Sequence, residues 1–197
     1  MGGEVRIRLL VIALFCLLPQ CATIQPPTGG EEDKAPPHLV STMPETLAAL
    51  AGVSNIVAVK EASGSLDQAS AIRARVPFTL LCGDDSLTLP MIAVGAAGVI
   101  SVAGNVAPRP MRDLCDLARG GRMAEAEALH RKLLPLFKAL FVESNPGPAK
   151  YLLAAMGLIE NELRLPLVPV EPVSERIVRE AAIETGLPLA PVAAGRA

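Results

Sequence analysis

Lys60 is the side chain in this sequence whose type and position best suit nucleophilic chemistry, because it follows the apolar run at residues 56–59. An amine held among apolar neighbours loses hydration and is more readily deprotonated. The neutral amine can attack a ketone and form a Schiff base. Lysines that end a strand are also commonly solvated surface residues, so this pattern alone leaves both interpretations open.

A second candidate segment, Gly83, Asp84 and Asp85, follows the expected buried strand at residues 78–82. Enzymes built on barrels of parallel strands keep their sites at the carboxyl ends of those strands. The simpler expectation is that Asp85 or Ser86 caps the helix that comes next. A pair of carboxylates could also bind a cation, but the sequence shows no third ligand nearby.

Strand patterns alternate with helical patterns in the middle of the chain. Strands are expected at residues 55–62, 78–82 and 98–103, and helices at residues 44–51, 65–75 and 86–94. This alternation predicts an α/β fold with a parallel sheet. Strand geometry places Lys60 on the face of Ala58, opposite Val59. Ile100 is interpreted first as core, with contact to a ligand as the alternative.

The strand patterns stop near residue 108. Helices are expected at residues 108–119, 123–142, 147–156 and 174–185, with breaks at the glycine pair 120–121 and at residues 145–148. The polar residues 143–146 could belong to a site, but a turn that ends a helix is the simpler interpretation. No glycine-rich phosphate loop follows a strand, which argues against a nucleotide-binding sheet.

The composition excludes several classes of function. The formal net charge is −2, so a nucleic-acid partner is not expected. The four cysteines and two histidines show no paired spacing typical of a metal site or a disulfide framework. Hydrophobic residues make up 51% of the chain but aromatic residues only 3%, so aliphatic side chains must supply most of the core.

Residues 1–43 differ in character from the rest. Arg6 and Arg8 precede the apolar run LLVIALFCLL, and LPQC at residues 18–21 resembles a bacterial lipobox with Cys21 as the lipidation candidate. The run is shorter than a membrane-spanning helix requires. A stretch rich in proline, glycine and charge follows, as expected of an extended tether. The alternative is an apolar N-terminal helix of a soluble protein.

Five segments in order resemble the dihydrodipicolinate synthase family: VAVKEASG at 57–64, LCGDD at 81–85, GVISVAGN at 98–105, FVESNPGPAK at 141–150 and LRLPL at 163–167. The resemblance runs from about residue 44 to residue 187. It implies a (β/α)8 barrel with a helical extension, usually a cytoplasmic homotetramer. It also implies condensation of pyruvate with aspartate semialdehyde in lysine biosynthesis. A sialic-acid-lyase type of pyruvate aldolase is the alternative within the family.

By this resemblance, Lys60 forms an imine with pyruvate, and Gly83, Asp84 and Ile100 lie around the substrate. The imine nitrogen is the electron sink, so neither a metal nor an organic cofactor is expected. Strands one to five of the family barrel, with their tyrosine, threonine and arginine residues, have no counterpart here. Tyr151, the single tyrosine, lies in the expected helical tail.

The expected organisation is therefore a lipoprotein-like leader and tether at 1–43, three strands of a partial barrel at 44–106, and a helical region at 107–197. The two unlike parts suggest a fusion, by rearrangement or by an error of sequence assembly, and an inactive truncated chain. The alternative from another class is a lipid-anchored interaction module that reuses a half-barrel as its scaffold.

Overall fold

The computed structural model describes residues 43–190. The strands are β1 (Ala58–Glu61), β2 (Thr79–Cys82) and β3 (Gly98–Val99). The α-helices are α1 (Met43–Leu50), α2 (Leu66–Arg75), α3 (Thr88–Ala93), α4 (Pro108–Arg119), α5 (Met123–Ala139), α6 (Gly147–Ala155) and α7 (Pro172–Thr185), and two 3-10 helices are η1 (Asp85–Leu87) and η2 (Ala103–Asn105).

The strands form one parallel sheet in the order β1-β2-β3. Lys60 is paired with Leu81, and Leu81 is paired with Gly98. Helices connect each strand to the next, as parallel strands require. The predicted α/β class with parallel strands is confirmed.

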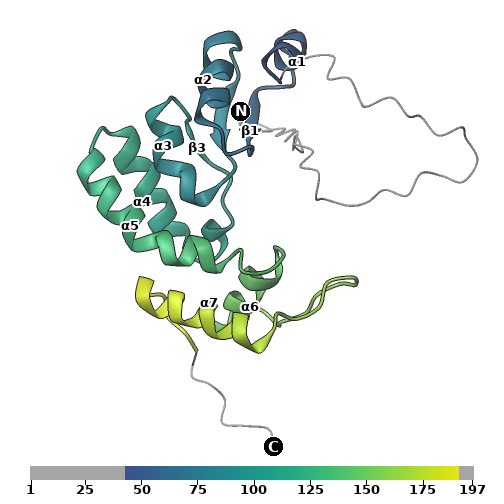
Figure 1. The fold of residues 1–197 in the computed structure, drawn as a ribbon, viewed down its shortest axis with the longest axis vertical. Coiled ribbons are helices and arrows are strands. Elements are labelled where there is room, and N and C mark those ends of the chain that lie inside the picture. Colours follow the sequence, from purple (N-terminus) through teal and green to yellow (C-terminus); the bar gives the residue numbers. More distant parts are fainter. Residues whose placement is uncertain (1–42, 191–197) are drawn as a thin grey trace, which may run out of the picture.

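The two faces of the sheet differ in burial. The helix-covered face carries Val59, Glu61, Leu80 and Cys82, all of them buried. The other face, here called the open face, carries Ala58, Lys60, Thr79 and Leu81, which are half-buried or exposed. Figure 1 shows α3, α4 and α5 to one side of the strands. The alternation expected around Lys60 is therefore present in the fold.

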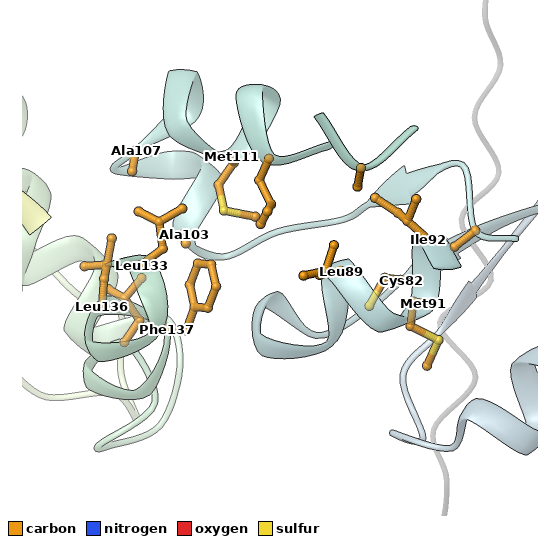
Figure 2. Close-up of a cluster of buried hydrophobic side chains, with 14 of the residues drawn as sticks. Cys82, Leu89, Met91, Ile92, Ala103, Ala107, Met111, Leu133, Leu136 and Phe137 are labelled. Atoms are coloured by element: carbon orange, nitrogen blue, oxygen red, sulfur yellow. The ribbon is translucent and has the colours of Figure 1, made fainter. Parts of the chain in front are cut away.

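One continuous apolar core joins the sheet to the helical tail. Cys82 from β2 and Met91 from α3 belong to the same cluster as Ala103, Leu133 and Phe137 (Figure 2). Helix α5 packs against both α4 and α7, and α6 packs against α7. Figure 1 shows α6 and α7 at the end of the molecule away from α2. Within residues 43–190, no helix is long and apolar enough to cross a membrane.

The structure differs from the expected elements around β3. Residues 98–103 were expected to form one strand, but only Gly98–Val99 is extended in the sheet, and η2 begins at Ala103. The Ile100 N–H still donates to the Cys82 carbonyl at 2.8 Å. Beyond it, side-chain acceptors rather than a strand partner take the backbone N–H groups, so the ladder ends. The expected helix 86–94 is likewise divided into η1 and α3.

Candidate functional site

Lys60 lies near the carboxyl end of β1, on the open face of the sheet. Its side chain is half-buried, and its register partner on the same face is Leu81. The next residue in that row is Gly98 of β3, which has no side chain beyond hydrogen. A Cβ added to Gly98 would meet no atom within 4 Å, so there is open space beside this row. In this row Lys60 therefore has the apolar Leu81 as its partner, with open space at Gly98 beyond it.

Glu61, the next residue, points to the opposite face and is 3% exposed. Its Oε1 accepts hydrogen bonds from the Ser63 N–H at 2.8 Å, from the Ser63 hydroxyl and from Gln68 Nε2 at 3.2 Å. These bonds join the end of β1 to the first turns of α2. Glu61 thereby fixes the strand end that carries Lys60, a role that the sequence analysis did not assign.

Gly83 lies in close contact with the end of β1. Its N–H donates to the Glu61 carbonyl at 2.7 Å. A Cβ at this position would lie 2.6 Å from the Cβ of Ala62, a distance that real Cβ atoms do not show. Glycine is therefore required here by backbone packing, whatever else the position does.

Asp84, and neither Asp85 nor Ser86, supplies the cap after β2. Its Oδ1 accepts from the N–H and the hydroxyl of Ser86, both at 2.8 Å. The expectation that Asp85 or Ser86 would be the cap is wrong, because the capped helix is the 3-10 turn η1, which begins one residue earlier than the expected α-helix. Asp84 is exposed, and both cap bonds go to Oδ1, so its Oδ2 takes no part in the cap.

Asp85 is buried, with 2% exposure, and its carboxylate reaches the loop after β3. Oδ2 accepts from the Val102 N–H at 3.1 Å and the Ala103 N–H at 2.8 Å. Burial raises the pKa of Asp85 above its ordinary value, against the lowering by hydrogen bonds from Ser101, Ala103 and Val102. This contact brings the ends of β2 and β3 together.

Ile100 directly follows the last residue of β3 and is half-buried. The Gly104 N–H donates to the Ser101 hydroxyl at 2.6 Å, which closes the following turn. The structure thus brings four residues to the same end of the sheet, where the carboxyl ends of its three strands lie: Lys60, Gly83, Asp84 and Ile100.

The polar run at residues 143–146 lies in the helical part of the chain, between α5 and α6. Glu143 accepts a hydrogen bond from the Glu171 N–H at 2.9 Å. Glu143 and Ser144 line a cavity of about 420 Å³ with Gly147 and with residues of the segment before α7. Within the described chain, no group of three or more histidine, cysteine, aspartate or glutamate side chains could hold a metal ion. Cys21 and the rest of the expected leader and tether up to residue 42 lie outside residues 43–190.

Fold and site together define an α/β protein whose lysine and polar residues gather at the carboxyl ends of parallel strands, as in enzymes of the (β/α)8 type. The family model described as the dihydrodipicolinate synthetase family matches residues 38–184. The chain belongs to this family.

Named relatives agree with that assignment. The chain is 47% identical over 144 residues to the 4-hydroxy-tetrahydrodipicolinate synthase of Koribacter versatilis, covering 72% of this chain and 48% of that protein. It is 44% identical over 154 residues to the enzyme of the same name from Thermotoga neapolitana, covering 75% and 52%. The chain therefore spans about half the length of the curated relatives it matches.

Solved structures show the same correspondence. The crystal structure of dihydrodipicolinate synthase from Aquifex aeolicus superposes with a TM-score of 0.73 at 44% identity, over 75% of this chain and 52% of that one. The synthase from Thermotoga maritima gives 0.70 at 42% identity, over 73% and 50%. The expected family is confirmed, and the three strands correspond to part of the fold of these relatives.

Proposed function

We propose that this chain carries the Schiff-base portion of a pyruvate aldolase of the 4-hydroxy-tetrahydrodipicolinate synthase type, with Lys60 as the catalytic residue. The observation that carries this proposal is the position of Lys60. It lies on the open face at the carboxyl end of β1, beside Leu81 and the side-chain-free Gly98. Family membership and the names of the relatives support the same reaction.

In the proposed reaction, the neutral Lys60 amine adds to the ketone carbon of pyruvate, and loss of water gives the imine. The imine nitrogen accepts electrons when a methyl proton leaves, and the resulting enamine carbon attacks the aldehyde of aspartate semialdehyde. The amino group of the added aspartate semialdehyde then attacks the imine carbon, which closes the ring and releases the Lys60 amine. No step in this sequence calls for a metal or an organic cofactor.

The neighbouring strand ends supply the proposed pyruvate-binding surface. Gly83 and Ile100 would border the pyruvate, and Asp84 would lie beside them with the carboxylate oxygen that its cap does not use. A backbone without a side chain at Gly83 allows close approach of a ligand as well as of β1.

Turnover requires more than the described strands. Among residues 43–190, the outer edges of β1 and β3 have no strand partner, since the sheet is β1-β2-β3. We propose that the isolated chain is inactive and that a partner polypeptide carrying the other strands of a barrel would supply proton transfer and hold the aldehyde. The homotetramer usual in the family is the proposed assembly of the completed enzyme.

Co-expression tests this proposal. The 197-residue chain would be produced with a polypeptide comprising the N-terminal half of a relative, and that relative's own two halves would serve as control. We expect condensation of pyruvate with aspartate semialdehyde in the mixed pair, and none in its Lys60→Ala variant. If the control pair is active and the mixed pair is not, the proposal fails. Turnover with N-acetylmannosamine instead would indicate the sialic-acid-lyase type.

The sequence of the leader raises the question of the cellular location of the chain. The family reaction belongs in the cytoplasm, and that is the proposed location. If Arg6, Arg8 and the apolar run act as a signal, Cys21 would be acylated and the chain held at a membrane surface. Labelling of cells with a palmitate analogue distinguishes the two: incorporation that Cys21→Ser abolishes would establish the anchored location.

The open face favours a second candidate function, a non-catalytic interaction module. Ala58 and Leu81 are only half-buried on this face, and Thr79 is exposed. A module that is stable without a partner should be monodisperse in size exclusion and should not bind an apolar dye. A dye-positive aggregate would count against this candidate.

A further inference from the structure

Asp85 joins two strand ends that are far apart in the sequence. Its Oδ2 accepts from the N–H groups of Val102 and Ala103, which follow it by 17 and 18 residues. Asp85 lies three residues after the end of β2, and Val102 lies three residues after the end of β3. Because the carboxylate is 2% exposed, water does not compete for these bonds as it does at the surface.

The loop between β3 and η2 depends on this contact. Ile100 donates to Cys82 at 2.8 Å, and Ser101 accepts from Gly104 within its own turn. Those bonds fix the start of the loop and its internal shape. Asp85 is the described side chain that holds the N-terminus of η2 against the end of β2. Its charge also suits two consecutive backbone N–H groups at the start of a helical turn.

Ile100 lies two residues before Val102 and shares this loop. A shift of the loop would move Ile100 relative to Gly83 and Lys60, which lie on the neighbouring strand ends. Displacement of a binding group by about 1 Å can change a reaction by about 100-fold. The Asp85 carboxylate bonds Val102 and Ala103 rather than Ile100, so its effect on Ile100 would be indirect.

We propose that Asp85 is a positioning residue, which holds the loop of Ile100 in place for pyruvate by bonding the Val102 and Ala103 N–H groups. This inference rests on the proposed function of Lys60. It assigns Asp85 a part in substrate binding that is separate from the cap made by Asp84.

Two readouts on the 197-residue chain test it. Hydrogen exchange followed by mass spectrometry reports on the peptide that contains Val102 and Ala103, and borohydride trapping at rising pyruvate concentration gives the half-saturating concentration for the Lys60 adduct. The variants are Asp85→Ala and Asp85→Asn, which retains a neutral acceptor. Val178→Ala, at a buried site in α7, is the matched control for lost stability.

In Asp85→Ala we expect exchange in this peptide to be about ten-fold faster, because two hydrogen bonds to a charged group are lost. The half-saturating pyruvate concentration should rise about ten-fold in Asp85→Ala. In Asp85→Asn it should lie between the values of the parent chain and of Asp85→Ala. Val178→Ala should leave it unchanged. If Asp85→Ala does not fold, Asp85→Asn carries the comparison on its own.

An unchanged half-saturating pyruvate concentration in a folded Asp85 variant would overturn the inference. An equal rise of that concentration in Val178→Ala would also overturn it. Absence of any pyruvate adduct in the parent chain would overturn the proposed function instead. The part of the inference that concerns the loop would then be decided by exchange alone, and unchanged exchange in Asp85→Ala would overturn it.

Discussion

The Cα of Gly83 lies so near Ala62 that a Cβ on the glycine would stand 2.6 Å from the Ala62 Cβ and 2.8 Å from the Glu61 carbonyl oxygen. The two strand ends that carry the candidate site are therefore packed backbone to backbone. This close approach brings Lys60 and the residues after β2 to one edge. It also gives the glycine a structural requirement that is independent of any ligand.

Gly83→Ala should destabilise the chain by about 1–3 kcal/mol, because the atoms it would meet are backbone and a short side chain that cannot move aside. Urea unfolding followed by circular dichroism would measure the loss. Gly98→Ala is the matched control, since its Cβ meets nothing within 4 Å, and we expect a change below about 0.5 kcal/mol. Equal losses in both variants would contradict this account of Gly83.

Ser65→Ala should cost about 0.5–2 kcal/mol in the free energy of unfolding, because Ser65 is the N-cap of α2 and accepts from the Gln68 N–H at 3.1 Å. Ser70→Ala is the control in the same helix. The Ser70 hydroxyl donates to the Leu66 carbonyl, which already belongs to the helix, and alanine is the better helix former. A loss in Ser70→Ala as large as that in Ser65→Ala would contradict the assigned cap.

The buried carboxylate of Glu61 should be coupled to Gln68. Glu61→Ala is expected to cost about 1–3 kcal/mol, since it removes the acceptor for Ser63 and Gln68. A double-mutant cycle with Gln68→Ala should give a coupling energy of about 0.5–3 kcal/mol. Glu160→Ala, at an exposed position, is the control for loss of a negative charge. Additive effects of Glu61→Ala and Gln68→Ala would exclude the bond as a stabilising contact.

Cys82 should make stability fall at alkaline pH. Burial raises the pKa of Cys82 from 9.0 to about 11, so the unfolded thiol ionises before the folded one. The native state holds its proton longer in this range, and stability is therefore lost as pH rises from 9 to 11. Unfolding free energies of the parent chain should fall more steeply over that range than those of Cys82→Ala. Parallel curves would contradict the prediction.

Features that depend on the local order of apolar and polar residues could be predicted from the sequence. The β-branched segment before Lys60 and the mostly apolar segment that ends at Cys82 predicted the strands. Alternation predicted that Lys60 and Val59 lie on opposite faces. The cap was misplaced because the choice between Asp84 and Asp85 depends on a 3-10 turn that the pattern does not distinguish from an α-helix.

Contacts between residues far apart in the sequence could not be predicted from the local sequence pattern. Asp85 bonds N–H groups 17 and 18 residues away, and this partner exists only once β2 and β3 are side by side. The same contact explains why the expected strand 98–103 is shorter. Glu61 did leave a signal that could have been used: an acid beside the lysine, with a serine two residues later and Gln68 seven residues later.

The most direct test of the central claim is borohydride reduction of the 197-residue chain in the presence of pyruvate, followed by peptide mapping. We expect a pyruvate adduct on the peptide that contains Lys60. We expect this adduct to be lost in Lys60→Ala and kept in Lys132→Ala, which changes an exposed lysine of α5. An adduct that persists in Lys60→Ala, or that maps to another lysine, would contradict the account.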